Sequence, residues 1–307
     1  MKRILILTSV LFTISNMSPV MAAYNETVVI AKLVLTHPDI NIMNNIEQTV
    51  DVVTRAEVAV IASKMVKELP TRLYLRYGKT KNNPLNDVSE EHWAYQDINK
   101  LRISGVVCGD ENQNFRPDEP CTYAEMIKIY LGVMGWYTLV EAQGDKYPDG
   151  YIQVAQDIGI HIPDVDINSA VTLDDAYYIT YQALITKTLD EAYLNAYVNK
   201  IDFIDYPSLL ERKHNIFQVR GYAEKLDSEH ITIDGIEYQG QVNDEDFTSG
   251  FVVCFYKNDK ENDVNIIVTC YPISVLNFDN SQDKSQDKAR QGDGRLCANF
   301  ILNLWKK

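Results

Sequence analysis

The chain has 307 residues, a formal net charge of −14 and a hydrophobic share of 46%. This length and composition provide enough apolar material for ordinary buried cores, and they predict one sizeable domain with a smaller one beside it. The acidic charge argues against a nucleic-acid partner, and the sequence has no basic run with interleaved aromatic residues. Most of the carboxylates are explained by solubility.

The first 23 residues have the organisation of a secretory signal peptide. Lys2 and Arg3 form a basic start, an apolar stretch follows, and the segment ends at the small residues Ala22 and Ala23, where cleavage is expected. No later segment approaches the length needed to cross a bilayer. We therefore expect residues 1–23 to be a signal peptide and the rest to be secreted without membrane insertion.

A short sequence motif occurs three times, each time at a predicted helix start. A threonine, which is a favourable N-cap, stands three positions before an acidic residue that can complete a capping box. By itself this pattern would predict only helix caps, but each copy also precedes apolar residues at helical spacing, so the recurrence indicates packed copies of one supersecondary unit. The copies are Thr54-Arg55-Ala56-Glu57, Thr122-Tyr123-Ala124-Glu125 and the degraded Thr172-Leu173-Asp174-Asp175.

The segment before the second copy defines the whole unit. Its apolar spacing predicts a helix over about 93–104, and Gly105 is a typical helix-ending residue. Residues 110–120 are rich in polar residues and proline, which predicts a loop. The unit is therefore a helix, a loop and a second helix that begins at the Thr122 box.

The order of residues from Leu85-Asn86-Asp87, through His92-Trp93-Ala94 and Asn114-Phe115-Arg116-Pro117, to the Thr122 box resembles the S-layer homology repeat of bacterial cell-surface proteins. The resemblance is specific over 85–136. It is weaker over 147–188, and over 24–70 it is limited to the box and its helix. It implies a mainly α repeat domain in which three helix-loop-helix units, the first and third divergent, form a pseudo-threefold prism.

The resemblance also implies a function. Such repeats attach exported proteins non-covalently to the secondary polysaccharide of the Gram-positive cell wall, often a pyruvylated glycan, in grooves between neighbouring units. The box arginine would hold the ketal carboxylate through paired hydrogen bonds. Carried over residue by residue, the expected glycan-binding residues are Arg55, Asp87, Trp93 and Asp149.

Structural alternatives accompany each of these residues. Trp93 could instead anchor the core, Asp87 and Asp149 could cap turns or helices, and Arg55 could be a solvated residue at a helix start. Arg116 could brace its loop. In the other two boxes tyrosine and leucine replace the arginine, at positions 123 and 173, which leaves glycan binding by those copies open.

The rest of the chain changes character. Residues 190–214 predict a linker helix, and from residue 216 the apolar period becomes two. With the hairpin signal Asp234-Gly235, this predicts a small, mostly antiparallel β-sheet or barrel over 216–275. Residues 276–307 are expected to be a flexible tail.

Five cysteines leave the disulfide pattern open. Cys108 and Cys121 flank one loop, and Cys254 and Cys270 fall on predicted neighbouring strands, so either pair could form a bridge, with Cys297 left over. No Cys/His cluster suggests zinc, and we expect no metal or cofactor.

Two functions follow as expectations. The first is a non-catalytic surface-layer protein, bound to the cell wall by residues 24–188, with other surface-layer proteins as possible partners. The alternative is a wall-associated enzyme, or an accessory subunit of one, with its site in the C-terminal β-domain.

Overall fold

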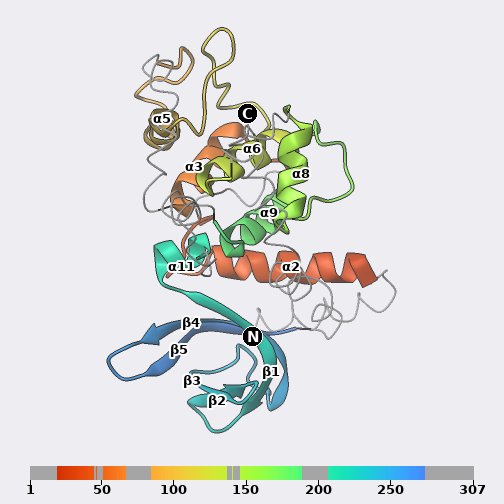
Figure 1. Cartoon of the computed structure of the whole chain (residues 1–307), viewed down its shortest axis with the longest axis vertical. Helices are drawn as coiled ribbons and strands as arrows, with labels where there is room; N and C mark the ends of the chain where they lie inside the picture. Colours follow the sequence, from red (N-terminus) through yellow and green to blue (C-terminus); the bar gives the residue numbers. More distant parts are fainter. Residues whose placement is uncertain are drawn as a thin grey trace, which may run out of the picture.

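The computed structural model describes residues 19–44, 46, 51–66, 84–136, 140, 146–188 and 207–273. In these residues a helical part lies next to a small β-barrel (Figure 1). Residues 1–18 of the expected signal peptide, most of the expected linker helix and all of the expected tail lie outside the described residues. The helices are α2 (Pro19–Leu35), α3 (Arg55–Met65), α5 (Tyr95–Ser104), α6 (Tyr123–Val133), α8 (Asp149–Asp157), α9 (Leu173–Ile185) and α11 (Leu209–His214).

Three helices, α3, α6 and α9, begin at the recurring box. Just before them, three backbone hydrogen bonds close a ring: Val53 donates to Val171 at 3.0 Å, Val171 to Cys121 at 2.8 Å, and Cys121 to Val53 at 2.9 Å. Each segment thus donates to one neighbour and accepts from the other. A second set repeats this pattern at the first residue of each helix, namely Arg55 to Glu119, Tyr123 to Ser169 and Leu173 to Asp51.

The outer helices follow the same cyclic order. Helix α5 packs on α3, α8 packs on α6, and α2 packs on α9. Each outer helix therefore covers a helix that begins at a different copy of the recurring motif. Helix α5 ends at Gly105, as predicted, because this residue adopts the left-handed conformation with a φ of 78°.

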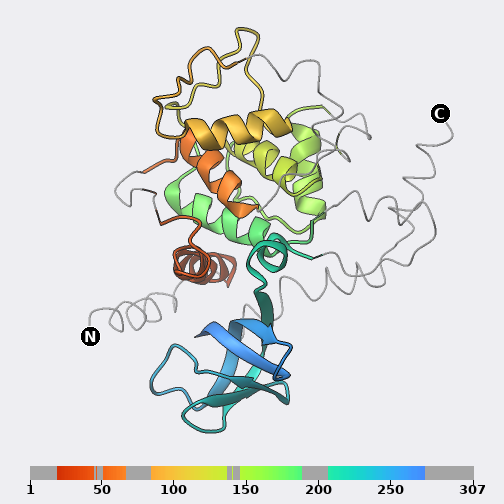
Figure 2. The same ribbon diagram turned by 90° about the vertical axis from the view of Figure 1, so that its left-hand side faces the viewer.

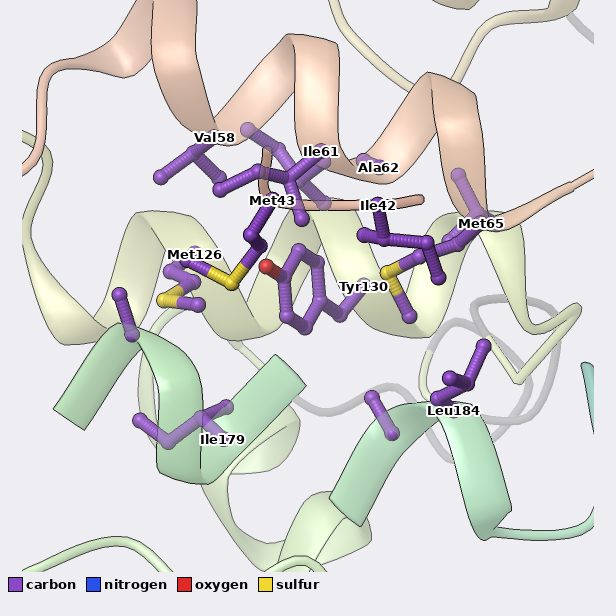
Figure 3. Close-up of a cluster of buried hydrophobic side chains, with 14 of the residues drawn as sticks. Ile42, Met43, Val58, Ile61, Ala62, Met65, Met126, Tyr130, Ile179 and Leu184 are labelled. Atoms are coloured by element: carbon purple, nitrogen blue, oxygen red, sulfur yellow. The ribbon is translucent and has the colours of Figure 1, made fainter. Parts of the chain in front are cut away.

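The core of the helical part lies between the three box helices. Apolar side chains from α3 and α6 face those of α9, and the buried ring of Tyr130 lies among them (Figure 3). The Tyr130 hydroxyl is not left unsatisfied, because it lies 2.6 Å from the Thr180 hydroxyl across the core. The cluster includes Ile42, Met43, Val58, Ile61, Met65, Met126, Ile179 and Leu184.

Helix α2 extends across the expected cleavage position. It starts at Pro19, passes through Ala22 and Ala23, and places the Tyr24 hydroxyl 2.5 Å from an Asp175 carboxylate oxygen on α9. Tyr24 would be one of the first residues after cleavage. The contact between the first and third copies of the unit would therefore involve the very start of the mature chain.

The C-terminal strands form a closed barrel in the order β1-β2-β3-β5-β4. The expected hairpin joins β2 to β3 at Asp234 and Gly235, whose φ angles are 48° and 81°, as a type I′ turn requires. The strands are β1 (Phe217–Lys225), β2 (His230–Ile233), β3 (Ile236–Gln239), β4 (Ser249–Asp259) and β5 (Val264–Pro272).

The sheet is mostly antiparallel, as expected, with one parallel pair. Strands β3 and β5 run parallel, with Gln239 opposite Ile266. The reason is parity, because strands that alternate in direction around a closed ring must be even in number. Five strands therefore leave one parallel pair.

Of the four cysteines that the structure describes, two form a disulfide and two are free. Cys254 and Cys270 are opposite each other on β4 and β5 and form a disulfide. Cys108 and Cys121 are both free, so the other candidate bridge does not form. Cys121 is buried at the ring of backbone hydrogen bonds, where burial raises the pKa of its thiol to about 12, whereas Cys108 is exposed. Cys297 lies outside the described residues.

The barrel is packed against the helical part through the outer face of β4 and β5. Val253, Phe255 and Tyr271 belong to the same buried cluster as the helical core. The Tyr181 hydroxyl of α9 accepts a hydrogen bond from Gln218 of β1 at 2.9 Å. The short helix α11 lies between the two parts (Figure 2). The two parts thus share a continuous apolar interface.

Candidate functional site

Arg55, the expected glycan ligand, is held inside the protein. It is the first residue of α3, and only 8% of it is exposed. Its Nη1 lies 2.6 Å from Oε1 of Glu125 at the start of α6, and its Nε donates to the Phe115 carbonyl at 2.7 Å. The guanidinium also lies over the Phe115 ring, 4.7 Å from its centroid. In this arrangement Arg55 joins the start of one box helix to the next.

Arg116 is the second guanidinium at this place and the more accessible one. Its Nη2 lies 3.0 Å from the same Glu125 Oε1, and its Nη1 lies 3.0 Å from Glu119. The side chain is 43% exposed, compared with 10% for Arg55. The two arginines and the two glutamates form what we call the arginine cluster. Arg116 is the outer cation of this cluster. It can replace its ion pair with Glu119 by one with a ligand carboxylate at little cost in free energy, because exposed ion pairs are weak.

Glu125 is the centre of this cluster. Burial alone would raise its pKa, but the Thr122 amide, Arg55 and Arg116 outweigh burial and hold the pKa below its ordinary value. The Thr122 amide donates to Glu125 at 3.1 Å, while the Thr122 hydroxyl accepts from the Glu125 amide at 3.2 Å. The same carboxylate therefore caps α6 and binds two guanidiniums.

Asp87 fixes the loop that carries Arg116. Its carboxylate accepts the backbone amides of Phe115 at 2.8 Å and of Arg116 at 2.6 Å. Arg116 has a φ of 59°, a left-handed conformation that costs free energy for a non-glycine residue. The two hydrogen bonds from Asp87 help to offset that cost. Asp87 is thus placed to orient Arg116 and Phe115.

Trp93 is not a core residue. It is 60% exposed, and its ring stacks on His92 with 5.9 Å between the centroids. The His92 Nε2 lies 3.4 Å from Asp118, in the same loop as Arg116. The structure therefore places a largely exposed indole near the loop of the arginine cluster, where an aromatic face is available to a ligand.

Asp149 lies apart from these residues in its local role. It is the first residue of α8, where a carboxylate is favoured by the helix dipole.

Tyr147, two residues before Asp149, was missed in the sequence analysis. Burial and then Glu125 raise the pKa of Tyr147, while Thr122 and Arg55 oppose the shift, which places its hydroxyl within the electrostatic reach of the arginine cluster. Only its position before a helix could have drawn attention to it.

The other two box positions show why the copies differ. Tyr123, in the place of Arg55, donates its hydroxyl to Asp175 at 2.5 Å, just as Arg55 contacts Glu125. Burial, followed by Asp175, raises the pKa of Tyr123 to about 12, so the hydroxyl stays protonated. Leu173, in the third copy, is 8% exposed and apolar. The contact of Arg55 is therefore ionic, and that of Tyr123 is a hydrogen bond from a neutral group to a carboxylate. Leu173 can form neither interaction.

Comparison with known proteins supports a surface role for this fold. Residues 84–127 match the S-layer homology domain. A "Cell surface protein" of Thermoanaerobacter kivui is 28% identical over 133 residues, which are 43% of this chain and 16% of that protein. The chain thus spans about a sixth of the length of this relative. No solved structure matches the chain. The chain therefore contains one segment that is similar to the S-layer homology domain.

The described residues also contain neither a metal-ligand cluster nor a membrane-spanning helix. Among the residues that the structure describes, no three His, Cys, Asp or Glu side chains are grouped so that they could hold a metal ion. Within the same residues, no helix combines the length and the apolar character that a membrane crossing requires.

Proposed function

We propose that this chain attaches non-covalently to the cell wall through three S-layer homology repeats, of which the first and third are divergent. The domain match covers the middle repeat. The closed ring of backbone hydrogen bonds and the cyclic packing of the outer helices support equivalent units over 24–70, 85–136 and 147–188, arranged as a pseudo-threefold prism. Export directed by a signal peptide over residues 1–23 would deliver the chain to this location.

The ligand we propose is an acidic sugar of the secondary cell-wall polysaccharide, such as a pyruvylated one. The observation that carries this is the arginine cluster, in which a partly exposed Arg116 lies beside a buried Arg55. A guanidinium binds a carboxylate through two parallel hydrogen bonds. We assign the outer contact to Arg116 and the inner positive charge to Arg55. Asp87 would position the loop, and the exposed face of Trp93 would cover a sugar ring.

We propose that the role is non-catalytic and that the barrel is displayed or joins other surface-layer proteins. The barrel interior is filled by a cluster that includes Ile231, Ile233 and Val252, together with the disulfide between Cys254 and Cys270. This packing favours a structural module over a catalytic one. Asp149 remains a proposed contact in the third repeat.

The test is binding of the purified protein to cell-wall sacculi, with and without removal of the secondary polysaccharide. Arg116→Ala is expected to weaken binding at least tenfold, because a hydrogen bond to a charged group contributes about 1.5 to 3 kcal/mol. Arg102→Ala on α5 is the matched control, since that arginine bonds Asn99 on its own helix. Binding that persists after the polymer is removed would refute the proposal.

A further inference from the structure

Three lysines converge at the end of α3 opposite to the arginine cluster. Lys64 is in the last turn of α3, Lys100 comes from α5 and Lys213 from α11. The Nζ of Lys100 donates to the Ser63 carbonyl at 3.0 Å, and both α5 and α11 pack on α3. All three side chains are partly exposed. In a chain with a net charge of −14, such a concentration of positive charge requires an explanation.

Lys213 lies within the electrostatic reach of the other two lysines. The pKa of Lys213 is lowered to about 8, first by burial and then by Lys100 and Lys64. Burial also lowers the pKa of Lys100, although Asp97 opposes that shift. Repulsion between like charges destabilises the folded state, and a bound anion would relieve it.

The charges around this lysine cluster do not neutralise it among the residues that the structure describes. The α3 carbonyl end and Asp97 favour Lys100. On the α11 side, Asp39 is engaged at 3.2 Å by Lys257 from the barrel. His214 follows Lys213 and is held neutral, because burial and Lys213 lower its pKa to about 4. The charges that shift the pKa of Lys213 are therefore those of Lys100 and Lys64.

We propose that Lys64, Lys100 and Lys213 form a second anion-binding site, which takes a phosphate group of a polyanion. A lysine ammonium is a compact charge without the planar fork that suits a carboxylate. Three such charges from three helices suit a tetrahedral, multiply charged group that presents oxygens in several directions. This site goes beyond the proposed carboxylate contact, because it lies at the other end of α3 and uses different residues.

The test is a thermal-shift and calorimetric titration of the whole protein with tripolyphosphate, at constant ionic strength set with sodium chloride. Wild-type protein is expected to gain several degrees in Tm and to bind with a measurable Kd. Lys64→Gln and Lys213→Gln should each weaken binding at least fivefold. Lys225→Gln, an equal change of charge at an exposed position on β1, should bind like the wild type.

The controls separate this site from its alternatives. A wild-type protein without saturable binding would overturn the proposal, and so would equal losses in the Lys225 control. Equal affinity for polygalacturonate, which carries only carboxylates, would overturn the assignment to phosphate. Circular dichroism and unligated Tm values show that the variants are folded, and we expect Lys213→Gln to melt no lower than the wild type because it removes repulsion. Arg116→Ala should retain tripolyphosphate binding, so failure of the wall-binding proposal leaves this result unaffected.

Discussion

At the scale of single residues, the box arginine and the loop arginine differ in exposure in a way that the sequence did not predict. Arg55 was expected to reach a ligand, yet it is mostly buried between Glu125 and the Phe115 carbonyl. Arg116 was considered a loop brace, and it does contact Glu119 of its own loop, while nearly half of its side chain faces solvent. The sequence could not reveal this, because burial of Arg55 depends on a partner 70 positions away in the chain.

Glu125 makes a pH-dependent contribution to stability. Its pKa is below its ordinary value of 4.5 in the folded protein, so the unfolded chain binds the proton more readily. The stabilisation is complete above pH 4.5 and is lost as the pH falls through the folded value. Glu125→Gln should therefore destabilise the protein at pH 7 and make its stability less dependent on pH below pH 4.5. Urea denaturation at a series of pH values measures both effects.

The matched variant for this prediction is Glu119→Gln. Glu119 also contacts Arg116, but its side chain is 58% exposed, so its removal should have little effect on stability at neutral pH. If the stability of the two variants depends on pH in the same way below pH 4.5, Glu125 is not the group that titrates.

At the scale of elements, the local signals were predictable and the contacts between elements were not. The N-caps at Thr54, Thr122 and Thr172, the end of α5 at Gly105 and the hairpin turn all follow from a few neighbouring residues, and the structure contains each of them. The degraded third box differs in a way that chain length explains. Aspartate is one methylene shorter than glutamate. The Asp175 carboxylate accepts hydrogen bonds from the hydroxyl groups of Thr172, Tyr123 and Tyr24.

The capping box of α6 can be tested directly. Thr122→Ala removes the acceptor for the Glu125 amide, which should cost about 1 kcal/mol of unfolding free energy, within the usual range of 0.5 to 2 kcal/mol. Thr122→Ser keeps the hydroxyl and should cost clearly less. Chemical denaturation compares the two. Equal losses would mean that the threonine methyl group, rather than the cap, is responsible.

At the scale of the whole molecule, the helical part and the barrel are joined by apolar packing. The period of two along β4 marks alternate residues as buried, but a sheet with one face in its own barrel core and the other against a helix has apolar residues on both faces. Val253 and Phe255 lie in the helical cluster, whereas Val252 and Cys254 lie in the barrel core. The continuous apolar run was visible in the sequence, but the element that covers its outer face was not.

This interface predicts that the two parts unfold together. Phe255 is fully buried, and its ring lies 6.3 Å from that of Tyr181 on α9. Truncation of a buried phenylalanine usually costs about 3 to 5 kcal/mol. Because that loss falls on the interface, Phe255→Ala should divide a single calorimetric transition into two, with the barrel and the helical part melting separately. Ile236→Ala, at a barrel residue that is 56% exposed, should preserve the single transition. Two separate transitions in the wild-type protein would show that the packing between the parts does not couple them.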